Sequence, residues 1–162
     1  HGILADGRWT DATGRLTWEL LHGDFLAYLD SAVPPDLIFY DPFSAKTDAA
    51  LWTSDVFTRV RARCEARPAE LYTYSAATAV RVALLTAGFH VAEGVGTGPK
   101  ATTTVAFTSA PGPAWASRLL GAPWLARWRR SHSQYPPSLS VEDRPAFARR
   151  IESHPQFVSG SV

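Results

Sequence analysis

Two aspartates directly follow apolar runs, which makes them the first residues to consider for chemistry. Asp41 comes after the run 37–40, and Asp24 comes after the aromatic-rich segment 15–22 and Gly23. In open α/β sheets, ligands bind outside the carboxyl ends of the strands, where a carboxylate can hold an amine or act as a base. Pro42 restricts the backbone after Asp41 and removes a hydrogen-bond donor. Each acid also has a structural alternative, because Asp24 can cap a helix and Asp41 can belong to a turn.

The segments that would position these acids alternate between strand-like and helix-like patterns. Strands are expected at 15–22, 37–40, 70–76, 89–96 and 102–109, and amphipathic helices at 24–32, 53–64 and 78–87. The run 37–40 is apolar throughout, which is typical of a parallel strand buried on both faces. The last two strands are close enough in sequence to pair antiparallel. The sequence therefore predicts an α/β fold with a mostly parallel sheet and an antiparallel final strand.

Composition excludes several classes of protein. No apolar run approaches the roughly 20 residues that cross a bilayer, so no membrane association is expected. The single cysteine, Cys64, lies on the apolar side of a helical pattern and is expected to be a buried thiol. The five histidines show no metal-ligand spacing, so no metal is predicted, and no G-x-S-x-G hydrolase motif occurs. A cytoplasmic location is expected.

The composition changes after residue 109. Residues 110–162 are rich in proline, tryptophan and arginine, and we interpret them as an extension with short helices around 115–128 and 142–151. The cluster Arg127, Arg129 and Arg130 is either a solvated helix face or a site for nucleic acid. Trp124 and Trp128 could stack on bases, although core packing is the favoured interpretation.

Three blocks of sequence resemble the methyltransferase domain of the MnmC-like tRNA 5-aminomethyl-2-thiouridine methyltransferase family. They are DLIFYDPFSAKTDAALWT (36–53), YTYSAATAVRVALLTAGF (72–89) and GTGPKATTTVAFTS (96–109), in the family's order and spacing. The first block departs from the family at Pro42, where glycine is usual, at Lys46, which is displaced by one position, and at Thr47-Asp48, where Asn-Pro is usual. The chain thus resembles a divergent branch of this class I, S-adenosylmethionine-dependent group.

The resemblance implies methyl transfer from S-adenosylmethionine to the amine of 5-aminomethyluridine at the wobble position of tRNA. Asp41 would be catalytic, holding or deprotonating the amine. The resemblance places the cofactor at Gly23, Asp24, Asp41, Pro42 and Phe43. The residues expected to bind substrate are Lys46, Tyr74, Ser75, Lys100, Arg127, Arg129 and Arg130.

The glycine-rich cofactor loop of the family has no counterpart in these 162 residues. We therefore expect 1–109 to be a partial methyltransferase domain that binds the cofactor weakly or not at all in isolation. An FAD-dependent oxidoreductase domain or protein is expected in the same pathway. Two alternatives stay open: a non-catalytic RNA-binding or scaffolding domain, and a methyltransferase with another amine or base as acceptor.

Overall fold

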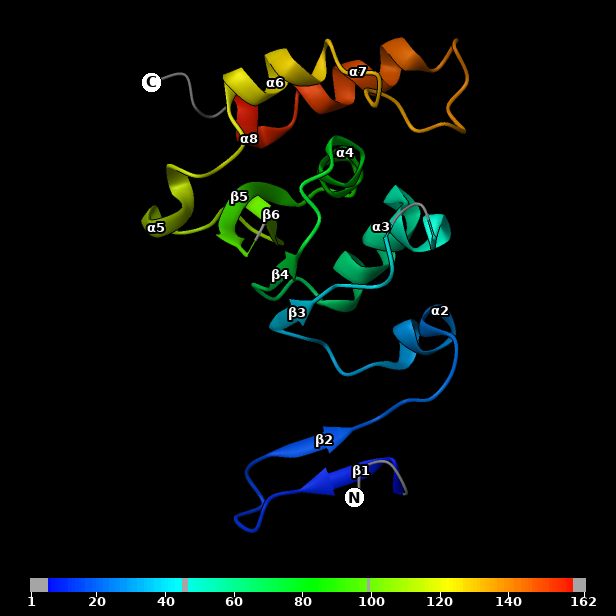
Figure 1. The fold of residues 1–162 in the computed structure, drawn as a ribbon, viewed down its shortest axis with the longest axis vertical. Coiled ribbons are helices and arrows are strands. Elements are labelled where there is room, and N and C mark those ends of the chain that lie inside the picture. The colour runs from blue at the N-terminus through cyan, green and yellow to red at the C-terminus, as the bar shows by residue number, and fades with distance from the viewer. Residues whose placement is uncertain (1–5, 45–46, 99, 159–162) are drawn as a thin grey trace. The chain divides into compact units, whose positions relative to one another are not determined.

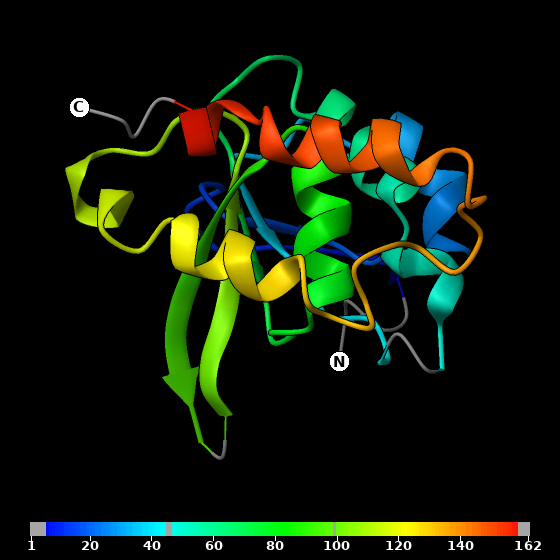
Figure 2. The same ribbon diagram turned by 90° about the horizontal axis from the view of Figure 1, so that it is seen from above.

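The computed structural model describes residues 6–44, 47–98 and 100–158 (Figures 1 and 2). The chain divides into two compact units, His1–Ala32 and Val33–Val162. Each unit has its own sheet and is described by itself.

The N-terminal unit is a β-hairpin followed by two short helical turns. Strand β1 (Arg8–Thr10) pairs antiparallel with β2 (Thr17–Glu19). The connecting loop is ordered by Asp11, whose carboxylate accepts from the Leu16 amide at 2.8 Å. Helix α2 (Phe25–Tyr28) and the 3-10 turn η1 (Leu29–Ser31) then occupy the predicted helical segment. The strand predicted at 15–22 is shorter than expected and belongs to this hairpin, not to the main sheet, because the tight loop pairs it with β1.

The second unit contains a four-stranded sheet in the order β3-β4-β6-β5. Strand β3 (Leu37–Phe39) is parallel to β4 (Glu70–Thr73), whereas β6 (Lys100–Phe107) is antiparallel to both β4 and β5 (His90–Thr97). Strands β3, β4 and β5 therefore run in one direction and only the final strand opposes them. This arrangement confirms the predicted class and sheet.

Two helices connect the strands of the main sheet. Helix α3 (Ser54–Arg63) follows the 3-10 turn η2 (Ala49–Trp52) and is capped by Thr53, whose hydroxyl accepts from the Val56 amide at 3.3 Å. Helix α4 (Thr78–Thr86) ends before Gly88, which has a φ of +88° and so occupies the left-handed position that favours glycine. Helix α4 is buried from Val80 through Thr86, not amphipathic as predicted, because it packs on both α3 and α7.

The C-terminal extension packs against this sheet unit. Its helices are α5 (Pro113–Ala116), α6 (Ala122–Trp128), α7 (Arg144–Glu152) and α8 (Pro155–Val158). Trp124, Leu125, Trp128 and Ile151 are buried, which confirms the predicted docked helices. The side-chain amide of Gln156 bonds to the backbone of β5 at Val91 through both its oxygen and its nitrogen. The division of function at residue 109 stays a prediction.

The exposure of β3 differs from the expected burial on both faces. Leu37 is 52% exposed and Phe39 is 79% exposed. In the part of the chain that the structure describes, β3 forms one edge of the sheet and pairs only with β4. The apolar run predicted that both faces of β3 are covered by other elements. The described neighbours of β3 do not cover Leu37 and Phe39 in this way.

Candidate active site

Asp41 lies where the chain leaves the carboxyl end of β3. The preceding residue, Tyr40, continues the pairing with β4, since its amide donates to the Tyr72 carbonyl at 2.8 Å. The Tyr40 ring is buried against Trp52 and Phe57, with centroid distances of 5.5 and 5.3 Å. This burial raises the pKa of the Tyr40 hydroxyl to about 12, so the hydroxyl stays protonated and donates to the Leu51 carbonyl. The buried tyrosine thus fixes the position from which Asp41 projects.

A second anchor holds the other side of the Asp41 loop. The Trp52 indole N–H donates to the Phe43 carbonyl at 2.8 Å. Asp41 and Phe43 are both exposed, and Pro42 between them is half-buried. The loop is therefore fixed at Tyr40 and at Phe43, while the carboxylate of Asp41 stays accessible. Lys46, the next residue predicted from the resemblance, lies outside the described residues.

Asp41 borders a hollow of about 520 Å³ on the sheet. It is lined by the following residues of β3 to β6, the adjoining loops and α5: Phe39, Asp41, Tyr72, Thr73, Tyr74, Val95, Thr103, Val105 and Trp115. Asp41 is the one carboxylate among these described residues. The volume falls within the range of small-molecule sites, and an apolar hollow with few polar groups is the usual form of such a site.

Aromatic rings form one wall of this hollow. Tyr72 packs on Phe39 at 5.9 Å between centroids and on Trp115 at 6.4 Å. The Tyr72 hydroxyl donates to Glu70 at 2.6 Å, and this hydrogen bond, together with burial, raises the pKa of Tyr72 to about 12. Tyr72 is therefore a neutral ring at neutral pH. Aromatic faces beside a carboxylate favour a flat or cationic ligand.

The structure separates the predicted neighbours Tyr74 and Ser75. Tyr74 lines the hollow with Asp41 and is 49% exposed. Ser75 does not line it, and its hydroxyl instead accepts from the Ala77 amide at 3.4 Å, before α4 begins. Lys100 begins β6, where its backbone pairs with Thr97. The geometry thus brings Tyr74, but not Ser75, to the site of Asp41.

Gly23 and Asp24 belong to the N-terminal unit. Asp24 caps α2, because its Oδ1 accepts from the Leu26 amide at 2.9 Å. Gly23 has a φ of +145°, and a Cβ atom at this position would stand 2.8 Å from the Tyr28 ring. Both residues have local structural roles, and their contribution to a cofactor site stays a prediction.

The three predicted phosphate-binding arginines have different surroundings. Arg129 pairs with Glu152 at 2.8 Å, and Arg127 approaches Glu93 at 3.6 Å. Arg130 is exposed and contacts no acidic side chain in the described part of the chain. The tryptophans between them are buried: Trp124 stacks on Phe157, and the Trp128 indole donates to the Gln134 carbonyl at 3.0 Å. Core packing is therefore confirmed for both tryptophans.

The sequence interpretation missed most of the wall of the hollow. Phe39 and Tyr72 are register partners on adjacent strands, and Phe39 precedes Asp41 by two residues. Because side chains alternate along a strand, this spacing could have placed Phe39 on the same side as Asp41. Trp115 carried no such signal, since its position depends on how the extension folds back onto the sheet.

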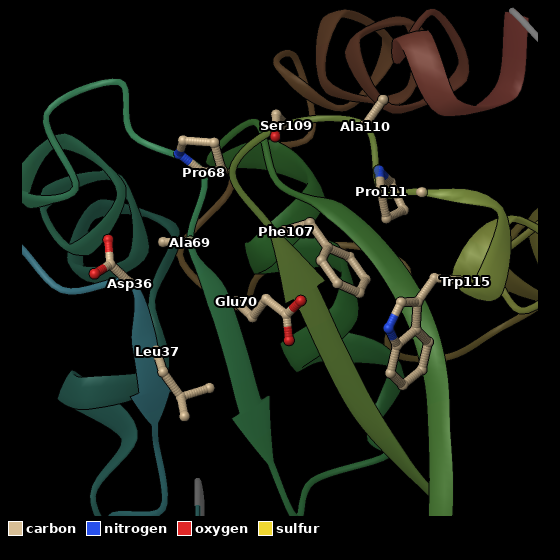
Figure 3. Close-up of a pocket in the computed structure, with 11 residues that line it drawn as sticks. Asp36, Leu37, Pro68, Ala69, Glu70, Phe107, Ser109, Ala110, Pro111 and Trp115 are labelled. Atoms are coloured by element: carbon tan, nitrogen blue, oxygen red, sulfur yellow. The ribbon is translucent and has the colours of Figure 1, made fainter.

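A second hollow, of about 430 Å³, lies at the opposite end of β3 and β4 (Figure 3). Figure 3 shows Glu70, Phe107 and Trp115 facing it from neighbouring elements. Its two acids already have partners, since Asp36 pairs with Arg67 at 2.8 Å and Glu70 accepts from Tyr72. Ligands of open α/β sheets bind at the carboxyl ends of the strands, so the hollow at Asp41 is the better candidate.

Other kinds of site find no support in the described part of the chain. No three histidine, cysteine, aspartate or glutamate side chains come together there in a way that could hold a metal ion. Cys64 is fully buried, and burial raises the pKa of its thiol, as expected for an inert cysteine. Among the described residues, no helix has the length and apolarity to span a membrane.

Comparison with known proteins identifies relatives of this chain. A protein of Cupriavidus metallidurans, named tRNA 5-methylaminomethyl-2-thiouridine biosynthesis bifunctional protein MnmC, is 36% identical over 121 residues, which are 74% of this chain and 17% of that protein. The protein of the same name from Burkholderia vietnamiensis is 33% identical over 134 residues, 82% of this chain and 18% of that protein. The chain therefore spans less than a fifth of the length of these two curated relatives.

A solved structure has the same fold. The crystal structure of MNMC2 from Aquifex aeolicus matches with a TM-score of 0.66 and 25% identity, over 96% of this chain and 50% of that chain. Residues 6–109 match the model of a family described as S-adenosyl-L-methionine-dependent methyltransferase. This segment contains Asp41 and all four strands of the main sheet. The chain belongs to the S-adenosyl-L-methionine-dependent methyltransferase family.

Proposed function

We propose that the protein carrying this chain transfers a methyl group from S-adenosyl-L-methionine to the amine of 5-aminomethyluridine at the wobble position of tRNA. The observation that carries this proposal is the position of Asp41, an accessible carboxylate fixed by buried neighbours at the carboxyl end of β3. The names of the relatives supply the substrate class, because they refer to biosynthesis of 5-methylaminomethyl-2-thiouridine in tRNA.

The hollow suits the reacting groups. When bound, S-adenosyl-L-methionine would supply an electrophilic methyl group on a positively charged sulfur. The rings of Phe39, Tyr72 and Trp115 offer faces on which a nucleobase can stack. Aromatic faces and the Asp41 carboxylate also favour positive charge, which fits the positively charged sulfur of the donor. The residues present therefore fit the methyl-transfer side of the cofactor, with Asp41 on the wall of the hollow, whereas Pro42 and Phe43 follow Asp41 in the chain and do not line the hollow.

Asp41 has two tasks in this proposal. Its carboxylate accepts an N–H hydrogen bond from the acceptor amine and so aligns the nitrogen lone pair with the methyl carbon. The methylated nitrogen would carry one extra proton, which the Asp41 carboxylate would accept. Alignment of the two reacting groups supplies most of the rate, and proton transfer contributes a smaller factor. Tyr74 borders the same hollow and would contact the acceptor base.

Replacing Asp41 tests the proposal. In the protein that carries this chain, Asp41→Ala should lower the rate of methylation of hypomodified tRNA by about 100-fold or more, the usual effect of removing a positioned base. Asp41→Asn should retain part of the positioning but not the proton transfer. Asp55→Asn is the matched control, since Asp55 is an exposed acid on α3 that does not line the hollow. Methylation that is equal in the Asp41 and Asp55 variants would exclude the mechanism and favour an RNA-binding scaffold.

The substrate also implies a setting for the reaction. We propose a cytoplasmic location for the protein, because its proposed substrate is a tRNA. The relatives are named bifunctional proteins, and we propose that an FAD-dependent oxidoreductase domain or protein acts in the same pathway. Methylation assays with free nucleosides, with other amines and with tRNA would identify the acceptor, since a preference for another amine or base would contradict the proposed substrate.

A further inference from the structure

A polar hollow of about 580 Å³ adjoins the beginning of helix α4. Its lining includes Thr78, Arg81, Glu93, Thr102, Arg127 and Ser131. Thr78 begins α4, directly after the loop that leaves the carboxyl end of β4. This hollow shares no described residue with the hollow at Asp41.

Arg81 brings a buried positive charge to this hollow. Its side chain is 5% exposed. It donates from Nε to the Thr104 hydroxyl at 3.1 Å, from Nη2 to the Thr103 carbonyl at 3.1 Å and from Nη1 to Glu93 at 3.3 Å. These bonds use three of the roughly five N–H donors of a guanidinium. Burying a charge is costly unless it is paired, so the charge of Arg81 needs a strong counterion.

Glu93 is a poor counterion because it is shared. The same oxygen that meets Arg81 also faces Nη2 of Arg127 at 3.6 Å. The distance from the Glu93 oxygen to Arg127 is too long for a hydrogen bond. The distance from the same oxygen to Arg81 is longer than the usual value for a charge-assisted hydrogen bond, which is about 2.8 Å. The Arg127 side chain is 64% exposed, so solvent screens its attraction to Glu93 and the ion pair is weak. Two positive charges thus face one carboxylate, and Arg127 can turn toward another anion at little cost.

We propose that this hollow binds an oxyanion of the phosphate class, held by Arg127 and Arg81. Thr78, Thr102 and Ser131 supply hydroxyl groups along its wall. The Glu93 carboxylate competes with the ligand for both guanidinium groups and thereby limits its affinity. The source of the oxyanion is either a backbone phosphate of the bound RNA or free phosphate. Only the first source rests on the proposed function.

Three variants of the full chain test this site, with inorganic phosphate as the first probe. Glu93→Gln keeps a hydrogen-bond acceptor for Arg81 but removes the competing charge, and it should tighten phosphate binding by about tenfold. Arg127→Ala should weaken binding by about tenfold and should leave the fold intact, because Arg127 is exposed. Arg149→Ala is the control, since Arg149 is exposed on α7, does not line the hollow and removes the same charge. Calorimetry at constant ionic strength gives the affinities, and circular dichroism verifies folding.

A second probe, an anticodon stem-loop RNA, distinguishes the two sources. If the same variants shift RNA affinity in the same directions, and Arg127→Ala lowers the salt slope by about one, the site holds an RNA phosphate. If only phosphate binding changes, the oxyanion site is supported with free phosphate as its ligand. If Glu93→Gln and Arg127→Ala behave like Arg149→Ala with both probes, the site is refuted. Because phosphate binding needs neither methyl donor nor acceptor, it can succeed where the proposed methyl transfer fails, and Asp41→Ala should leave it unchanged.

Discussion

Gly94 occupies a position in β5 that has no room for a side chain. A Cβ atom there would stand 2.2 Å from the Thr103 hydroxyl and 3.1 Å from a methyl group of Val105. Thr103 is itself held, because its hydroxyl donates to the Val95 carbonyl at 3.0 Å. Gly94→Ala should therefore lower the free energy of unfolding by about 1–3 kcal/mol, the usual cost of overpacking. Urea denaturation measures the change.

Gly112→Ala is the control for this prediction. Gly112 has a φ of −65° and nothing within 4 Å of its built Cβ, so alanine should change the unfolding free energy by less than about 0.5 kcal/mol. Equal losses in the two variants would show that crowding between β5 and β6 does not explain the glycine.

Single residues differ in how far the sequence predicts their place. Asp41 follows an apolar run, and that pattern alone identified it as a strand-end acid. The burial of Cys64 followed equally from the helical spacing of its apolar neighbours. Trp52 lies in the first block that resembles the family, but the sequence could not assign it as the anchor of the Phe43 carbonyl. That contact depends on the path of the loop between the two residues.

At the scale of elements, α8 and the start of β5 meet at two histidines. The ring centroids of His90 and His154 lie 5.5 Å apart, and the backbone amide of Gln156 donates to Nδ1 of His154 at 3.2 Å. Burial lowers the pKa of His154 to about 4, helped by the neighbouring His90 and by Arg61. Burial also lowers the pKa of His90, and Arg61 adds to this effect. Both histidines are therefore neutral in the folded protein at neutral pH.

Acid should loosen this junction. Histidine in the unfolded chain has a pKa of about 6.5, whereas His154 in the folded protein has a pKa of about 4. Between these two pH values the unfolded chain therefore binds protons that the folded protein does not bind. The free energy of unfolding should thus be fully retained above pH 6.5 and should fall on acidification by about 1.4 kcal/mol per pH unit for each such proton. His154→Asn keeps an acceptor for the backbone amide of Gln156. It should reduce the dependence of the unfolding free energy on pH by the contribution of one proton. Urea denaturation from pH 4 to 7.5 tests the change.

The exposed His132 provides the reference for the junction. Asp and Glu side chains also titrate in this range, but they do so equally in His154→Asn and His132→Asn. A slope that is the same in these two variants would rule out the junction as the source of acid sensitivity.

Elements show where local pattern is sufficient and where it fails. The beginning of α3 at Thr53 and the end of α4 at Gly88 follow from capping chemistry, which depends on neighbouring residues, and both were predicted. The burial of α4 and the exposure of β3 were not, because each depends on which distant elements cover it. Helix α7 covers α4, and β3 is an edge strand of the described sheet.

At the scale of the molecule, the directions of the strands in the main sheet agree with the predicted fold. Assignment of the hairpin to a separate sheet could not be foreseen, because a short strand with alternating side chains fits either kind of sheet. The predicted site residues Asp41 and Tyr74 both line the hollow, but the aromatic wall of the hollow combines β3, β4 and α5. Such a wall is a property of tertiary packing and has no local signature.

The main sheet carries an exposed apolar face, and this feature predicts how the chain behaves in solution. Phe39 is 79% exposed and Val95 is 63% exposed, and both line the hollow beside Asp41. Exposed apolar patches of this kind bind apolar ligands or partners. An apolar fluorescent dye should therefore bind the chain, and Phe39→Ser should weaken the binding by about fivefold or more, as expected for loss of about 1–2 kcal/mol of ring contact.

Phe43→Ser is the control, because Phe43 is 75% exposed but does not line the hollow. Equal effects of the two substitutions in a fluorescence titration would mean that the dye binds to exposed aromatic rings in general. A loss of binding only in Phe39→Ser would locate the binding surface on the sheet, beside the proposed catalytic carboxylate of Asp41.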